Sequence, residues 1–144
     1  MPLFSSGDFL LSSGRHSEFK IDCDNLLESD IKTLAWMISE MVGPFSEVQG
    51  VPSGGMILAN FMTTYAIPSQ VDHPDPRMWG RRLIVDDVLT TGGSMERARQ
   101  AYLESQPEAV RAKHMVIGAV IFSRGQCPPW IQPLFQLHGK LFSK

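Results

Sequence analysis

Two adjacent carboxylates, Asp86 and Asp87, directly follow a short apolar run, Leu83-Ile84-Val85. The next residues are rich in hydroxyl groups and glycine, and a helical pattern begins at Ser94. Backbone N–H groups in such a turn, together with the positive end of the following helix, can bind a phosphate. We therefore predict a strand, an anion-binding loop and a helix that Ser94 caps. The loop residues that would contact the anion are Val88, Leu89, Thr90, Thr91, Gly92, Gly93 and Ser94.

The two aspartates need a reason of their own, because neighbouring residues on a strand point to opposite faces and like charges repel. A ribose offers two hydroxyls from which a carboxylate can accept hydrogen bonds. A magnesium diphosphate offers a hard cation that prefers oxygen ligands. Asp86 and Asp87 are thus predicted to be catalytic residues that position Mg²⁺ through water and a diphosphate. A sugar with a phosphate at one end and a diphosphate at the other fits this pattern.

The segment 85–93, with the sequence VDDVLTTGG, resembles the phosphoribosyl-pyrophosphate signature of type I phosphoribosyltransferases. The resemblance implies an α/β fold with a Rossmann-like parallel sheet flanked by helices, and Mg²⁺ as the metal. The alternative is a buried strand with a solvated acidic turn and a capped helix.

The segment 7–22 resembles the N-terminal stretch of orotate phosphoribosyltransferases. In that family this segment is part of a hood over the base, which implies that Phe19 lies near a planar pyrimidine. We predict one domain over residues 1–144, with residues 1–24 as the hood and 25–144 as the core. The alternative for this segment is an ordinary hairpin with a Ser-Gly turn.

The segment 47–56 resembles the pyrophosphate loop of the same family. Ser53, Gly54 and Gly55 would then bind the diphosphate through backbone N–H groups at a helix N-terminus. The same residues also occur in common turns, which is the alternative.

Arg124 follows a continuous apolar run, 114–122, that has the length of a strand. In an open α/β sheet, residues just beyond the carboxyl end of a strand are placed for ligand binding. The resemblance implies that Arg124 binds the carboxylate of orotate, for which a guanidinium is suited. Ser123 stands where the family has an aspartate, and a surface arginine without a ligand is the alternative.

The family pattern is incomplete in the segment between Thr64 and Arg81, which lacks the Lys-rich mobile loop of active orotate phosphoribosyltransferases. Arg77 is the best substitute and is predicted to be catalytic. The tip of the segment 68–80 reaches at most about 20 Å from its base, so Arg77 is expected to contact the diphosphate within its own subunit. Slow turnover follows from this shortened loop.

Strand and helix patterns alternate along the chain and predict a βαβαβ order, hence a parallel sheet with helices on both faces. An apolar stripe from Leu27 to Val42 predicts a helix that Ser29 or Asp30 caps and Gly43-Pro44 ends. The further predicted elements are strands at 48–51, 83–85, 115–122 and 134–137 and helices at 56–64 and 95–104.

Composition narrows the class of protein. The chain has 144 residues, of which 43% are hydrophobic, and a formal charge of -2, so neither disorder nor a general affinity for nucleic acid or membranes is indicated. Cys23 and Cys127 lack CxxC spacing and are expected to be reduced thiols. No signal peptide or membrane span is recognised, so a cytoplasmic protein is predicted.

Three functions remain open. The first is transfer of a phosphoribosyl group from phosphoribosyl pyrophosphate to a nucleobase, orotate before others. The second is a catalytically weak or inactive regulator that binds phosphoribosyl pyrophosphate or a nucleotide. The third is a transferase for another base, such as a purine. The resemblance also implies a homodimer, for which the region of Trp36, Met37 and Met41 offers apolar surface.

Overall fold

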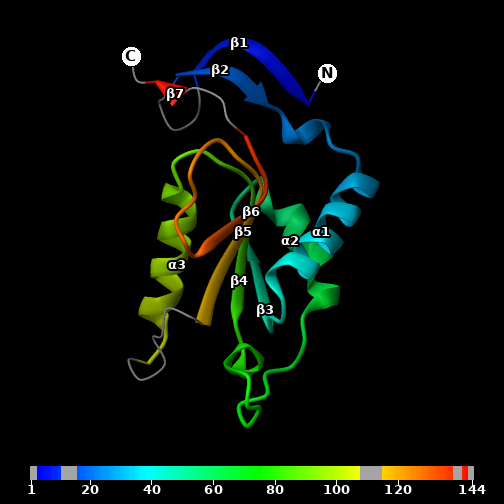
Figure 1. Cartoon of the computed structure of the whole chain (residues 1–144), viewed down its shortest axis with the longest axis vertical. Helices are drawn as coiled ribbons and strands as arrows, with labels where there is room; N and C mark the ends of the chain where they lie inside the picture. Colours follow the sequence, from blue (N-terminus) through cyan, green and yellow to red (C-terminus); the bar gives the residue numbers. More distant parts are fainter. Residues whose placement is uncertain (1–2, 11–15, 108–114, 138–140, 143–144) are drawn as a thin grey trace.

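The computed structural model describes residues 3–10, 16–107, 115–137 and 141–142 of the chain. It has a four-stranded sheet, a three-stranded sheet and three α-helices (Figure 1). The strands are β1 (Phe4–Leu10), β2 (His16–Ile21), β3 (Glu47–Gly50), β4 (Arg82–Leu89), β5 (Val116–Ser123), β6 (Ile131–Gln136) and β7 (Leu141–Phe142). The helices are α1 (Glu28–Val42), α2 (Gly55–Met62) and α3 (Gly93–Ser105).

The four-stranded sheet is parallel throughout, in the order β3-β4-β5-β6. Its two central strands read as nearly continuous apolar runs because both faces of the sheet are covered. Leu83 and Val85 pack on one face with α1 and α2, whereas Ile84 packs on the other face with α3. The prediction of a parallel α/β sheet with helices on both faces is confirmed.

The two helical crossovers of this sheet have opposite hands. Each step, from β3 to β4 and from β4 to β5, moves to the next strand in the same direction. The helix of the first step, α2, nevertheless lies on the opposite face from α3. Since parallel crossovers are right-handed in about 98% of cases, one of these two connections departs from the usual hand.

The three-stranded sheet caps the carboxyl ends of the parallel strands (Figure 1). β1 and β2 form an antiparallel pair, and β7 pairs with β2. Phe4 of β1 contacts Phe122, near the end of β5, with ring centroids 5.5 Å apart. The predicted hood, residues 1–24, therefore has a further strand from the C-terminal region, Leu141–Phe142, which the sequence assigned to the core. The turn residues 11–15 lie outside the described residues.

Several predicted boundaries are wrong by a few residues. β4 does not end at Val85 but continues through both aspartates to Leu89, because its pairing with β5 extends to Ser123. The last strand begins at Ile131 and runs through Pro133, which an edge strand tolerates. Leu27 is the N-cap of α1, not Ser29 or Asp30. Asp30 instead accepts a hydrogen bond from the N–H group of Leu27 at 3.3 Å.

The connection between α2 and β4 lies at the amino ends of the strands (Figure 1). Arg81 fixes it there, because its guanidinium donates to the carbonyl oxygens of Val42 and Pro44, at the end of α1. Burial lowers the pKa of Arg81 from its ordinary value. Among the described residues, the structure has no helix both long and apolar enough to cross a bilayer.

Candidate functional site

Asp86 and Asp87 lie near the carboxyl end of β4, with half-buried side chains. Each carboxylate accepts a hydrogen bond from the backbone N–H group of the next residue. Asp86 Oδ1 accepts from Asp87 at 2.8 Å, and Asp87 Oδ1 accepts from Val88 at 2.7 Å. These bonds fold the two side chains toward the end of the strand, as the predicted roles require.

The glycine loop, residues 52–55, packs directly against these aspartates. A Cβ on Gly54 would collide with the carboxylate of Asp87, and one on Gly55 would collide with the carbonyl oxygen of Val85. Only glycine therefore allows the loop to approach β4 this closely. The loop is anchored at its base, because the N–H group of Val51 donates to Val85 at 2.9 Å. Ser53 lies on it, exposed, and its peptide bond with Pro52 is cis.

The hydroxyl loop, residues 89–94, connects β4 to α3. Gly92 has φ +84° and is the N-cap of α3. This left-handed conformation favours glycine, and it replaces the predicted cap, because Ser94 lies inside the helix. Leu89 is buried and anchors the loop, while Thr91 and Ser94 are exposed. The loop thus presents hydroxyls and a helix N-terminus at the same end of the sheet as the aspartates.

A negative charge on both aspartates at once is disfavoured. Burial, together with the hydrogen bond and the charge of Asp87, raises the pKa of Asp86 to about 8, from 3.8. This rise favours the protonated form of Asp86 at neutral pH. A ligand that brings a cation or donates hydrogen bonds would favour the ionised form.

Cys23 reaches the same region from the hood side. Burial, followed by the charges of Asp87, Asp24, Asp22 and Asp86, raises the pKa of its thiol to about 12. Such a thiol stays protonated and is a poor nucleophile. Cys23 and Cys127 are both free thiols. Sequence spacing did not place Cys23 beside the aspartates, since the two segments are joined only by tertiary packing.

Arg124 lies beside the hydroxyl loop, and its N–H group donates to the carbonyl oxygen of Leu89 at 3.0 Å. Its residue surface is only 3% exposed, and burial lowers the pKa of its guanidinium. Ser123 is also buried, and its hydroxyl donates to the carbonyl oxygen of Gly125 at 2.6 Å and accepts from Cys127 Sγ at 3.2 Å. The burial of Arg124 excludes the alternative that it is a surface arginine.

Arg77 is not brought to this site. It lies beside Arg81 and Gly43 at the amino end of the sheet, whereas Asp87 follows Arg82 by five residues of β4, about 16 Å along the strand. Its guanidinium bonds Asp75 at 2.8 Å. The structure thus does not bring Arg77 together with the aspartates, and its contact with a diphosphate in the same subunit stays a prediction. The separation arises because α2 runs back from the glycine loop, so the segment after it starts at the amino end of the sheet.

The side chain of Phe19 lies outside what the structure describes, although its backbone belongs to β2. Among the described residues, no group of three or more His, Cys, Asp or Glu side chains is placed to hold a metal ion. The two aspartates therefore offer carboxylate oxygens without a closed cage, which suits a magnesium ion that keeps water and substrate oxygens as ligands.

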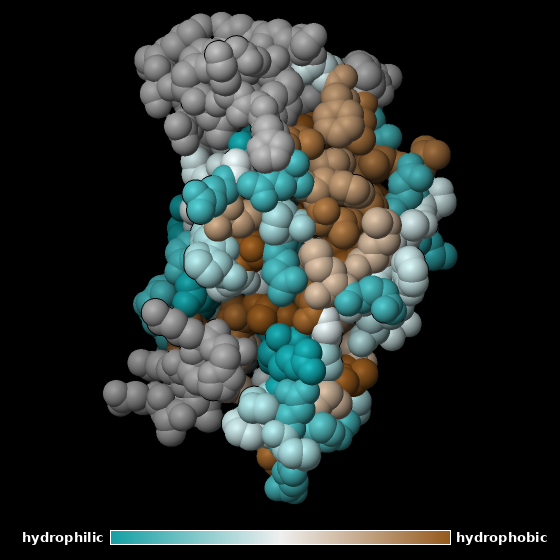
Figure 2. Space-filling view, in the orientation of Figure 1, coloured by the Kyte–Doolittle hydropathy of each residue, from teal (hydrophilic) through white to brown (hydrophobic). Residues whose placement is uncertain are grey.

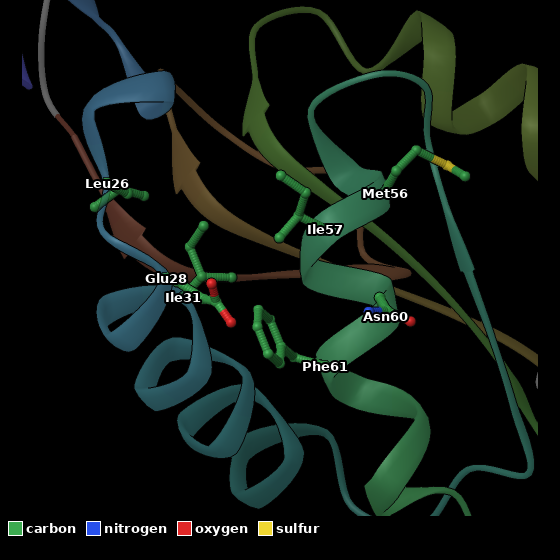
Figure 3. Close-up of a pocket in the computed structure, with 7 residues that line it drawn as sticks. All are labelled: Leu26, Glu28, Ile31, Met56, Ile57, Asn60 and Phe61. Atoms are coloured by element: carbon green, nitrogen blue, oxygen red, sulfur yellow. The ribbon is translucent and has the colours of Figure 1, made fainter.

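A separate groove lies between the start of α1 and α2 (Figure 3). It has a volume of about 520 Å³, and its lining is mostly apolar. The residues that line it are Leu26, Glu28, Ile31, Met56, Ile57, Asn60 and Phe61. Hydrophobic residues gather over this part of the molecule (Figure 2). Sequence analysis did not predict this groove.

Comparison with known proteins gives a consistent group of relatives. The orotate phosphoribosyltransferase of Aeropyrum pernix is 32% identical, over 83% of this chain and 72% of that protein. The orotate phosphoribosyltransferase of Pyrobaculum aerophilum is 31% identical, over 84% of this chain and 69% of that protein. The chain spans 65% to 72% of the length of the curated relatives it matches. Protein-family models give no match.

Solved structures of orotate phosphoribosyltransferases have a similar fold. The crystal structure of orotate phosphoribosyltransferase from Aeropyrum pernix has a TM-score of 0.69 at 24% identity and covers 94% of this chain and 88% of that chain. That of the Mycobacterium tuberculosis enzyme in complex with phosphoribosyl pyrophosphate has a TM-score of 0.61 at 20% identity, over 90% and 86% of the two chains. At these identities the likeness establishes the fold.

The first prediction concerns Asp86 and pH. The folded protein holds a proton on Asp86 up to a pKa of about 8, whereas the unfolded chain releases it near pH 4, so stability falls between these values as pH rises. Asp86→Asn removes this loss and can still accept the N–H group of Asp87. We expect thermal midpoints that coincide at pH 4 and a variant that is roughly 5–15 °C more stable at pH 8.

Asp72→Asn, in the exposed segment before Arg77, is the matched control and should show no such pH trend. A difference between Asp86→Asn and the wild type that is the same at pH 4 and pH 8 would contradict the assignment.

Proposed function

The chain belongs to the type I phosphoribosyltransferase family, among proteins similar to orotate phosphoribosyltransferases, and on that premise we propose that it transfers a phosphoribosyl group to a nucleobase. The donor is phosphoribosyl pyrophosphate, and diphosphate is released. Orotate is the favoured base, because orotate phosphoribosyltransferases are the relatives that match.

The contact between the glycine loop and β4 carries this proposal. It places the carboxylate of Asp87 against Gly54, the N-cap of α2, next to Gly55, the first residue of that helix. The hydroxyl loop follows two residues after Asp87. A ribose held at the aspartates would therefore have an anion-binding loop on either side, one for its diphosphate and one for its 5′-phosphate.

In the proposed reaction, a ring nitrogen of the base forms a bond to C1 of the ribose while the bond from C1 to the diphosphate oxygen breaks, and the proton of that nitrogen is released to water. The electron pair of the broken bond leaves with the diphosphate. Asp87 would accept hydrogen bonds from the ribose hydroxyls and hold C1 in line with the base. The protein thus acts through position and charge and needs no nucleophile of its own.

Mg²⁺ fits the donor set, because Asp86 and Asp87 supply hard oxygen ligands. When bound, it would neutralise charge on the leaving diphosphate. The raised pKa of Asp86 agrees with a site that is completed by a cation.

One observation favours the alternative of a weak or inactive binder. The segment 66–81 supplies no cation to the diphosphate side, since Arg77 bonds Asp75 and Arg81 bonds the end of α1. Loss of one donor to a developing charge can cost about 10²- to 10³-fold in rate. We therefore expect binding of phosphoribosyl pyrophosphate with slow turnover.

The second prediction separates these functions. Purified protein with Mg²⁺ and phosphoribosyl pyrophosphate should release diphosphate with orotate, slowly, and less with uracil or a purine base. Calorimetry should show that Asp87→Asn binds phosphoribosyl pyrophosphate about 10- to 100-fold more weakly than the wild type, because it loses charge-assisted hydrogen bonds.

Binding without diphosphate release for any base would establish the regulator instead. Wild-type protein that does not bind phosphoribosyl pyrophosphate would contradict both functions.

The third prediction concerns the base. The backbone N–H group of Arg124 donates to Leu89 of the hydroxyl loop, and Arg124 follows by two residues Phe122, which contacts Phe4 of the hood. Because Arg124 is buried, Arg124→Ala should weaken orotate binding by roughly 2 to 4 kcal/mol. Its affinity for phosphoribosyl pyrophosphate should stay nearly unchanged. Titration of each ligand by calorimetry provides the measurement.

Arg124→Lys is the matched variant, since it keeps the charge but loses the bidentate geometry and should recover only part of the affinity. Equal losses for both ligands in Arg124→Ala would point to a folding defect and count against a role in base recognition.

The fourth prediction is a homodimer that uses the groove between α1 and α2. Ile57 is 57% exposed and Met56 is 52% exposed there, and Trp36 of α1 is 51% exposed. Light scattering at micromolar concentration should give twice the monomer mass for the wild type and a monomer for Ile57→Glu. Val71→Glu, at an equally apolar and exposed position in the segment before β4, should remain dimeric. A monomeric wild type would refute the proposal.

A further inference from the structure

Arg97 lies one turn inside α3 and reaches back over the hydroxyl loop. Its Nη2 donates to Ser94 Oγ at 3.2 Å. Its Nη1 lies 3.2 Å from the position that a Cβ would take on Gly93, and Thr91 Oγ1 lies 3.7 Å from the same point. The guanidinium and the Thr91 hydroxyl therefore flank the space that Gly93 leaves open at the start of the helix.

The charge of Arg97 has no bonded counterion among the described residues. Arg77, Arg82 and Arg99 each pair with a carboxylate. Arg97 instead donates to a neutral hydroxyl. Its positive charge thus stands uncompensated beside backbone N–H groups that already favour an anion.

Glu96, the neighbouring residue in the first turn, would oppose an anion if its charge faced the loop. It is held elsewhere: its carboxylate accepts from Arg99 Nη1 at 3.1 Å and from Trp130 Nε1 at 3.0 Å. The guanidinium of Arg99 also lies over the ring of Trp130, with 5.0 Å to the centroid. This cluster offsets the negative charge of Glu96.

The hydrogen bond with Arg97 also orients the hydroxyl group of Ser94. Its oxygen accepts a hydrogen bond from Arg97, which leaves its own proton free to be donated to a second acceptor. A phosphate at the open space beside Gly93 would be such an acceptor.

We infer that Arg97 is a further substrate-binding residue, which contacts the 5′-phosphate of phosphoribosyl pyrophosphate and orients Ser94 to donate to the same group. The inference rests on the proposed function, in which the hydroxyl loop binds that phosphate. A guanidinium is well matched to phosphate because it donates two parallel N–H bonds. Arg97 thus adds to the loop a full positive charge that backbone groups alone do not supply.

Two probes divide the substrate and so test the inference. Ribose 5-phosphate carries only the 5′-phosphate, whereas magnesium diphosphate occupies only the other end. Calorimetry should show that Arg97→Ala weakens ribose 5-phosphate binding about 5- to 30-fold and changes magnesium diphosphate binding less than about twofold. Arg97→Lys should recover part of the affinity. Arg77→Ala removes the same charge from the amino end of the sheet and should leave ribose 5-phosphate affinity unchanged.

The thermal midpoint of Arg97→Ala should match that of the wild type, since Arg97 is exposed. Unchanged ribose 5-phosphate affinity in Arg97→Ala would overturn the inference and leave the proposed function intact. Equal losses for both probes would also overturn it, because the effect would not be local to the phosphate. A wild type that binds neither probe would overturn the proposed function, and the inference with it.

Discussion

The close approach of the glycine loop to the end of β4 is the constraint on which the site depends. Two glycines meet a carboxylate and a carbonyl oxygen where any side chain would collide. The hydrogen bond from Val51 to Val85 holds this contact at the end of β3, four residues before the end of β4. Because the strands are parallel, β5 ends beside them, and its next residue, Arg124, joins the same edge. Backbone packing therefore sets the positions of the site residues, and their side chains add charge.

The distribution of charge follows from that geometry. Carboxylates gather at the centre, where burial and mutual repulsion keep one of them protonated. Positive charge flanks them, in the buried guanidinium of Arg124 after β5 and in the exposed guanidinium of Arg97 on α3. The arginines at the amino end of the sheet serve the fold: Arg81 holds the end of α1, and Arg82 pairs with Glu47 and covers the ring of Tyr102. A cation bound by these carboxylates would thus relieve the repulsion between them.

Much of this arrangement could be predicted, because the motifs are local. For residues 85–93 the sequence indicated the order of a strand, a loop and a helix start, since carboxylate, glycine and hydroxyl residues at this spacing are typical of few other structures. The strand end itself was misplaced, because pairing with β5 carries β4 past Val85. The position of Arg77, away from the aspartates, was not predicted because loop length gives reach but not direction. The direction of this segment could have been predicted from the sequence, since a helix that follows a parallel strand returns to the strand's amino end. The contact between Arg97 and Ser94 could also have been predicted, because the two residues are three apart on one helix face.

The pairing of β7 with β2 has a consequence for how the chain folds. His16 and Phe142 are register partners although more than a hundred residues separate them, whereas the parallel strands join segments much closer in sequence. Contacts of long sequence separation carry the largest loop-closure entropy, so they form late. The β1–β2 hairpin alone would be only marginally stable. The sheet that bears the glycine loop and the hydroxyl loop is thus expected to assemble first, and the hood gains its third strand only after that sheet exists.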